Sequence, residues 1–318
     1  MSSVMRRRIQ SFIVLISIVC PFSARAGYDF TIIDPPGSAF TQAFGINNSG
    51  HVVGNTAFND GTDLRFSYDS KTGTLTEFAS VPGAFTGVIG INEPGVVVGI
   101  ATDELTFNDR GFILDRRGRF TLFSYPGLDN TDARAIDNSG RVTGYAFQND
   151  FSDFTGFIYD PGRNTFVDIR IPNSVFITAQ GINGRDEVVG SVNFDAGGAC
   201  TGCPAGVYGF LRDGNGTITL FRANSMNNKT RARGITDSGL IAGSFVDPAH
   251  GSGEQGFVVI PPRNGGFHLL NITDSDLVNV PGALETIPEG ITNSGQIAGY
   301  TTNADGKLQG FIATPTGK

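Results

Sequence analysis

Tryptophan is absent from this chain of 318 residues, and cysteine and histidine occur only three times each. The histidines His51, His250 and His268 are far apart in the sequence and form no His-x-His or His-Glu-x-x-His pair of the kind that binds zinc. The sequence also has no Gly-x-Ser-x-Gly nucleophile motif and no glycine-rich phosphate loop that leads into a helix. Sequence motifs therefore assign no catalytic residue.

Long apolar runs are absent after the first 26 residues. Within those residues, Arg6–Arg8 precede an apolar stretch at 11–20, and Ala24–Ala26 provide a small-x-small cleavage site. The apolar stretch is too short to span a bilayer comfortably. We expect residues 1–26 to be a signal peptide that is cleaved after Ala26. The mature protein would then be secreted or periplasmic and would have no membrane span.

Clusters of basic residues are also missing. Removal of the leader takes away four arginines and no acid, which changes the formal net charge from −7 to −11. Binding to nucleic acid needs clustered Lys and Arg side chains against the phosphates. Since the acidic residues are spread along the whole chain, we expect no nucleic-acid partner, and we expect a monomer.

The expected export also bears on the oxidation state of the cysteines. Cys20 lies in the expected leader, and Val19 before it disfavours lipid attachment, which needs a small residue there. Cys200 and Cys203 remain as one pair, and in an oxidising compartment we expect them to form a disulfide. The alternative is a thioredoxin-like redox motif, but the surrounding glycine-rich segment offers no helix to lower a thiol pKa.

Glycine, in contrast, is plentiful, with 44 residues, and much of it belongs to an internal repeat. Six segments align, with spacings of 45, 45, 46, 53 and 56 residues between their third positions. They are AFGINNSGHVVG from Ala43, VIGINEPGVVVG from Val88, ARAIDNSGRVTG from Ala133, AQGINGRDEVVG from Ala179, ARGITDSGLIAG from Ala232 and PEGITNSGQIAG from Pro288. Such a regular period indicates repeated units of one fold.

Each repeat reads as four short strands, here called a to d. Strand a runs into GIN, b is the VVG run, c contains Gly-Phe or Arg-Phe, and d is a run such as TLTEF. β-Branched and aromatic residues bounded by Gly, Asn and Asp turns favour strands, and no helical periodicity is visible. Four strands in about 45 residues is the size of a β-propeller blade.

The two ends of the chain share one repeat. The sixth repeat stops after strand c at Gly310–Ala313, whereas Tyr28–Ile33 reads as a strand d that precedes every complete repeat. We expect an all-β, six-bladed β-propeller with four antiparallel strands per blade, whose last blade is closed by the N-terminal strand. This single domain covers 27–318, with blades at 38–83, 84–127, 128–172, 173–224, 225–282, and 283–318 together with 27–37.

These repeats resemble those of the bacterial extracellular HAF family, which is named after a His-Ala-Phe triplet. The resemblance rests on the GIN-x-x-G-x-VVG pattern and covers almost all of residues 27–318. At the triplet position this chain has Gly-Phe or Arg-Phe, and the Trp that often follows is absent. The resemblance implies an extracellular repeat protein without a defined activity, and it transfers no catalytic residue.

Strand alternation puts the short a–b and c–d turns on one face and the longer, variable b–c and d–a loops on the other. Variable loops on a rigid scaffold usually carry binding sites, so we expect a site on the second face. The aromatic candidates there are Phe107, Phe147, Phe194 and Phe245. Their rings could stack on sugars or grip a peptide, or they could instead pack between the blades.

Three arginines lie near the start of strand a, where the central channel would open: Arg134, Arg231 and Arg233. Each could hold a carboxylate or a phosphate through paired hydrogen bonds, or could pair with a neighbouring acid such as Asp132. The repeated Asn- and Asp-rich turns offer one acid each at most, too few for calcium. We expect no cofactor, with calcium in the acidic loops 59–63 or 150–153 as the alternative.

Three functions remain open. The first is a non-enzymatic recognition module for a glycan, a peptide or a cell-surface partner on the b–c and d–a loop face. The second is a lyase or glycosidase, which would need two carboxylates about 5–10 Å apart at the channel mouth. The third is a structural component of the cell envelope or matrix. We expect the first, since no catalytic motif is present.

Overall fold

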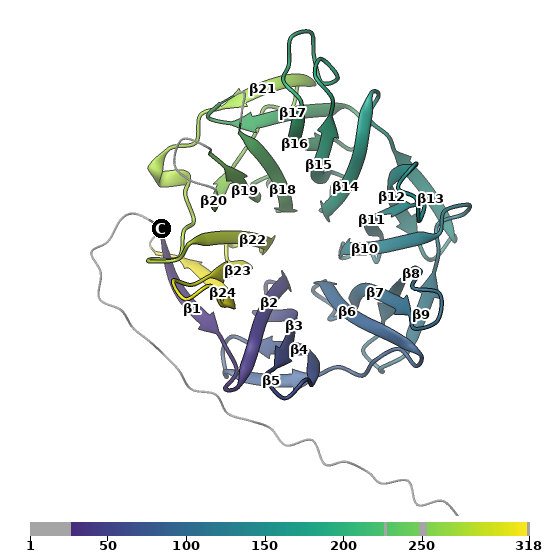
Figure 1. Cartoon of the computed structure of the whole chain (residues 1–318), viewed down its shortest axis with the longest axis vertical. Coiled ribbons are helices and arrows are strands. Elements are labelled where there is room, and N and C mark those ends of the chain that lie inside the picture. The colour runs from purple at the N-terminus through teal and green to yellow at the C-terminus, as the bar shows by residue number, and fades with distance from the viewer. Residues whose placement is uncertain (1–26, 226–227, 248–252, 317–318) are drawn as a thin grey trace, which may run out of the picture.

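The structure is a computed structural model that describes residues 27–225, 228–247 and 253–316. Six small sheets surround a central axis like the blades of a propeller, as Figure 1 shows. The expected leader, residues 1–26, lies outside the described residues. Among the described residues, no helix is long and apolar enough to cross a membrane. The six-bladed all-β fold is confirmed.

The strands follow the repeats. Blade 1 contains β2 (Ser38–Ile46), β3 (His51–Phe58), β4 (Asp63–Asp69) and β5 (Thr74–Glu77); blade 2 contains β6 (Ala84–Ile91), β7 (Val97–Asp103), β8 (Asp109–Leu114) and β9 (Phe120–Phe123); blade 3 contains β10 (Asn130–Ile136), β11 (Val142–Phe147), β12 (Phe154–Asp160) and β13 (Thr165–Ile169). Blade 4 contains β14 (Ser174–Ile182), β15 (Val188–Phe194), β16 (Gly206–Arg212), β17 (Ile218–Ala223) and β21 (Gly266–Leu270); blade 5 contains β18 (Lys229–Ile235), β19 (Ile241–Val246) and β20 (Glu254–Val259); blade 6 contains β22 (Glu285–Ile291), β23 (Ile297–Thr302), β24 (Leu308–Pro315) and β1 (Tyr28–Ile33). A single 3₁₀ turn, Asp274–Asp276, is the only helical element among the described residues.

The N-terminal strand closes the ring. β1 pairs antiparallel with β24, in a register that runs from Tyr28 opposite Pro315 to Ile33 opposite Gly310. Ile33 is only 3% exposed and belongs to a core cluster that continues into blade 1. Strands from both parts of the chain therefore complete blade 6, as the split repeat predicts (Figure 1).

Blades 4 and 5 depart from four strands each. The segment 266–270 lies within the predicted blade 5, but as β21 it pairs in parallel with β17 and becomes a fifth strand of blade 4. Blade 5 keeps three strands, and a single bridge between Phe257 and Leu277 takes the place of its fourth. Leu270 and Ile272 are buried with Phe257 in one cluster, so the exchange preserves the apolar packing between the two blades.

The glycine of the VVG run and the phenylalanine of strand c form one packing unit. A Cβ at this glycine would lie 1.9–2.2 Å from a carbonyl oxygen of strand a and 2.7–2.9 Å from the ring of that phenylalanine. The six rings are fully buried: Phe66, Phe112, Phe157, Phe210, Phe257 and Phe311. Only glycine leaves room for the ring, which explains why the two motifs recur together.

Strand a carries a β-bulge in every blade. The register to strand b shifts by one residue, so that one residue of strand a has no partner in the ladder. In five blades the next residue is glycine, at which a Cβ would lie 2.6–3.0 Å from the backbone of the neighbouring blade. These glycines let the six innermost strands approach each other closely around the axis.

Candidate functional site

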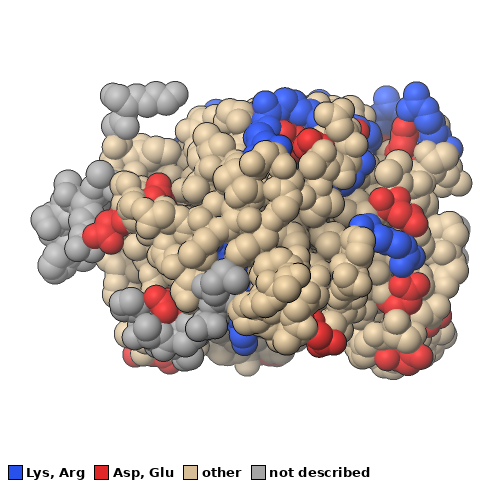
Figure 2. All heavy atoms as spheres, turned by 90° about the horizontal axis from the view of Figure 1, so that it is seen from above, with Lys and Arg blue, Asp and Glu red and all other residues tan. Residues whose placement is uncertain are grey.

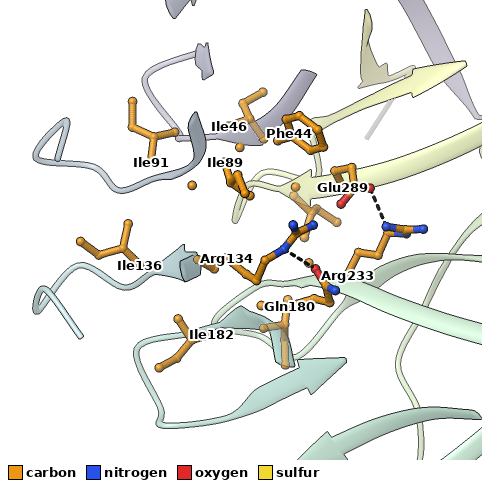
Figure 3. A pocket seen from close by; sticks show the side chains of 18 residues that line it. Phe44, Ile46, Ile89, Ile91, Arg134, Ile136, Gln180, Ile182, Arg233 and Glu289 are labelled. Carbon is orange, nitrogen blue, oxygen red and sulfur yellow. Dashed lines mark hydrogen bonds and ion pairs between the residues drawn. The ribbon is translucent and has the colours of Figure 1, made fainter. Parts of the chain in front are cut away.

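The bulges determine what lines the axis. The unpaired residue of each strand a, together with the glycine or alanine and the isoleucine that follow it, lines a cavity of about 110 Å³. The six bulged residues, one per blade in order, are Phe44, Ile89, Arg134, Gln180, Arg233 and Glu289. Figure 3 shows their side chains around this axial cavity. Bulges commonly re-aim a side chain in this way.

The axial cavity has an apolar and a polar side. Blades 1 and 2 contribute Phe44 and Ile89, whereas blades 3 to 6 contribute two arginines, a glutamine and a glutamate. The Nε of Arg134 donates a hydrogen bond of 2.9 Å to Oε1 of Gln180, across the seam between blades 3 and 4. Arg233 and Glu289 form an ion pair of 2.5 Å across the seam between blades 5 and 6 (Figure 3).

A second acid tightens the network at blades 5 and 6. Glu254, at the start of β20, forms an ion pair with Arg231 and lies 3.6 Å from Arg233. Burial raises the pKa of Glu289, and the positive charge of Arg233 acts in the opposite direction. Arg231 and Arg233 are therefore already paired with acids. Of the three predicted arginines, only Arg134 has no ion pair within 4.0 Å among the described residues.

A buried acid stands above Arg134 on the same strand. Asp132 on β10 is 6% exposed, and its Oδ1 has no hydrogen-bond partner. Burial raises the pKa of Asp132 to about 6. The negative charge of Asp109 also raises this pKa, whereas a hydrogen bond from Tyr145 and the positive charge of Arg134 lower it. The side chain does not line the axial cavity. Of the described residues that line the axial cavity, Glu289 is the only one with a carboxylate.

The a–b turns join the blades in a ring of hydrogen bonds that sequence analysis missed. In five of the six blades the second residue of the turn donates its backbone N–H to a side-chain oxygen of the next blade. The bonds run from Asn48 to Glu93, Glu93 to Asn138, Gly184 to Asp237, Asp237 to Asn293, and Asn293 back to Asn48. The available signal was the recurrence of Asn, Asp or Glu at that position in most repeats.

One seam lacks this link. Between blades 3 and 4 the accepting position is Gly184, which has no side chain. There, Nη1 of Arg141 instead donates to Oδ1 of Asp186 at 2.6 Å and joins the two blades. The ring surrounds a second polar cavity of about 80 Å³, and six isoleucines line both cavities. The carboxylates of Glu93, Asp137 and Asp237 also line this second cavity.

The predicted aromatic residues have different fates. Phe194 and Phe245 are 1% and 2% exposed and pack in the core, which is the alternative that the sequence left open for them. Each ring packs against an aromatic ring of strand c: the centroids of Phe194 and Tyr208 are 5.5 Å apart, and those of Phe245 and Phe257 are 6.2 Å apart. Both residues are buried, as phenylalanine usually is in folded proteins.

Phe107 and Phe147 lie at the surface of the b–c loops of blades 2 and 3. Phe107 is 67% exposed, and Phe147 stacks on Phe151, which is also 67% exposed, with centroids 5.7 Å apart and planes 8° apart. The loop of blade 2 also lies beside Phe85, which is 62% exposed at the start of β6. Phe85 and Phe151 were not predicted from the sequence, although Phe151 lies within a b–c loop.

The two loops are tied together. Nδ2 of Asn149 donates to Oδ1 of Asn108 at 3.0 Å, and Nδ2 of Asn130 donates to Oδ1 of Asn149 at 2.8 Å. Phe107 and Phe151 both have φ of 59°, a left-handed conformation that is unfavourable for a bulky residue. We call Phe85, Phe107, Phe147 and Phe151 with Asn108 and Asn149 the aromatic platform.

Cys200 and Cys203 form the predicted disulfide. It lies in the loop between β15 and β16, beside buried Tyr208, whose hydroxyl donates to the carbonyl of Pro204 at 2.7 Å. The Arg222 guanidinium stacks 3.7 Å from the centre of the Tyr208 ring and donates to the carbonyl of Ala205. These contacts anchor the base of the longest insertion.

The acidic loops use their carboxylates within turns. Asp60 accepts hydrogen bonds from the backbone and hydroxyl of Thr62 at 3.0 and 2.7 Å, and Asp150 accepts one from the backbone of Ser152 at 2.9 Å. Within the described part of the chain, no group of three or more His, Cys, Asp or Glu side chains could hold a metal ion. Figure 2 shows basic and acidic side chains interspersed on one side of the ring.

No protein-family model and no curated protein matches the sequence. Solved structures match its fold. An oligogalacturonate lyase in complex with manganese has a TM-score of 0.51 and 10% identity, over 92% of this chain and 94% of that one. TolB from Acinetobacter baumannii (TM-score 0.47, 9% identity, 86% of this chain) and the β-propeller domain of the Trilobed protease from Pyrococcus furiosus (TM-score 0.46, 11% identity, 88% of this chain) are also similar. The chain spans 54% of TolB and 84% of the Trilobed protease domain. At these identities the likeness concerns the fold alone.

Proposed function

We propose that this propeller is a non-enzymatic recognition module that binds glycans on the aromatic platform of blades 2 and 3. The observation that carries the proposal is the pair of strained, exposed rings, Phe107 and Phe151, on loops that an asparagine bridge holds together. Strain at exposed residues persists only where the surroundings impose it, and it is concentrated at functional sites.

The chemistry of the aromatic platform suits a sugar. Aromatic faces pack against the C–H faces of sugar rings, while neighbouring amides and carboxylates bond to hydroxyl groups. The amides of Asn108 and Asn149 and the carboxylate of Asp150 lie within the same two loops. A peptide partner would need an apolar groove or an open strand edge. Exposed rings alternating with polar groups fit a glycan better.

Binding to a glycan array, followed by calorimetry on the glycans that bind, tests the proposal. Replacement of Phe107 or Phe151 by alanine should weaken binding about tenfold or more, as for an aromatic anchor at the centre of an interface. The matched control is Val167→Ala, since Val167 is 50% exposed on the outer strand of blade 3 and far from the loops in sequence. Equal losses in all three variants would refute the site, and release of a cleaved product would refute a purely binding role.

A further inference from the structure

The side chain of Arg134 lines the axial cavity and has two nitrogens that the protein does not bind. Its Nε donates a hydrogen bond to Gln180, whereas within the described residues its Nη1 and Nη2 have no hydrogen-bond partner. These two nitrogens are not among the buried unpaired atoms, and the side chain lines the cavity. In Figure 3 the guanidinium of Arg134 points inward toward the axis. The free side of the guanidinium is therefore available to a ligand.

A guanidinium with two free amino groups matches a carboxylate, which accepts two parallel hydrogen bonds from it. The neighbouring cation, Arg233, cannot serve in the same way, because Glu289 and Glu254 already surround it. Glu289 also lines the cavity, and its negative charge disfavours a ligand with two charges, such as phosphate. The charges select a singly charged anion.

The apolar side of the axial cavity determines which group the rest of the ligand should carry. Phe44 and Ile89 provide an apolar wall next to Arg134 in the ring of blades, and Ile91 extends it. A cavity of about 110 Å³ is smaller than the roughly 150 Å³ engineered cavity that holds benzene, so the ligand has only a few heavy atoms. We propose that the axial cavity binds a small monocarboxylate, with its carboxylate on Arg134 and its alkyl tail against Phe44 and Ile89.

This site is separate from the aromatic platform, and its test does not depend on glycan binding. The full chain is titrated calorimetrically with acetate, propionate, butyrate, 1-butanol and inorganic phosphate. Affinity should rise about fourfold for each added methylene, because each one buries apolar surface against the wall. Butyrate should bind more tightly than either 1-butanol or phosphate.

Arg134→Gln should weaken butyrate binding at least tenfold, since it removes a charged, paired hydrogen bond. Arg117→Gln, at an exposed turn of blade 2, is the matched control and should bind as the wild type does. Gln180→Glu is the second variant. It pairs Arg134 with a carboxylate of the protein and should lower butyrate affinity while the melting temperature is kept or raised.

Two results overturn the proposal. One is the absence of any carboxylate binding to the wild type in the millimolar range. The other is butyrate affinity that is unchanged in both Arg134→Gln and Gln180→Glu. If Arg134→Gln does not fold, as judged by circular dichroism, Gln180→Glu alone decides between the two outcomes.

Discussion

Gly99 on β7 is a position where one added methyl group should be strongly destabilising. Its Cβ would lie 2.0 Å from the carbonyl oxygen of Gly87 and 2.8 Å from the ring of Phe112. Because real Cβ atoms do not approach backbone atoms closer than about 3 Å, strands β6 and β7 would have to separate by about 1 Å. The backbone of β6 cannot rotate away as a side chain could.

The expected cost follows from what that separation breaks. Loss of one or two ladder hydrogen bonds costs about 1 kcal/mol each, and displacement of a fully buried phenyl ring costs a further 1–3 kcal/mol. Gly99→Ala should therefore lower the free energy of unfolding by about 3 kcal/mol or more. Gly87→Ala is the control on the neighbouring strand, since its Cβ would meet only Nδ2 of Asn55 at 3.9 Å.

Urea denaturation followed by far-ultraviolet circular dichroism measures both variants, as the chain contains no tryptophan to follow by fluorescence. Gly87→Ala should be neutral or stabilising by up to about 1 kcal/mol, because alanine loses less backbone entropy than glycine in a strand. Equal midpoints for the two variants would mean that the ring of Phe112 does not require glycine beneath it. The packing unit described for all six blades would then be wrong.

Two further predictions concern the ring closure and the buried acid. Ile33→Ala on β1 should cost about 2–4 kcal/mol in unfolding free energy, whereas Thr31→Ala at an exposed position of the same strand should change it by less than about 0.5 kcal/mol; similar effects would argue against closure by packing. Burial raises the pKa of Asp132 from 3.8 to about 6, so the folded protein binds more protons than the unfolded chain, and stability should fall as the pH rises through this window, by up to about 3 kcal/mol. Asp132→Asn should abolish that part of the pH dependence in denaturation between about pH 4 and 7; an identical dependence in the variant would contradict it.

The sequence predicted the propeller well because the repeat expresses local rules. Alternating apolar residues, Asx turns and glycines at fixed positions recur in each unit, so six copies could be recognised without any contact map. The orphan strand Tyr28–Ile33 predicted closure, because an unpaired strand edge has to be covered. The disulfide was equally local, since its two cysteines are three residues apart.

The candidate sites were harder. Phe147 follows the last glycine of its repeat motif by three residues, whereas Phe194 follows the corresponding glycine by four and Phe245 by two. Because side chains alternate between the two faces of a strand, Phe194 and Phe245 are buried in the core, whereas Phe147 is on the other face and stacks on the exposed ring of Phe151. The position of β21 was also not predicted. The sequence alone favours a hairpin within blade 5, whereas in the structure β21 pairs in parallel with β17 of blade 4.

The repeat by itself determined the number of blades, the order of strands and the strand that closes the ring, since these depend on patterns that each segment carries within it. The tertiary structure decided what meets at the axis. Four polar residues of the axial cavity are separated in the sequence by 46–56 residues from one to the next: Arg134, Gln180, Arg233 and Glu289. Only the circular arrangement of bulged strands brings one residue from each blade to a common centre. Which arginine is paired and which is free depends on neighbours in the next blade, and that is a property of the closed ring.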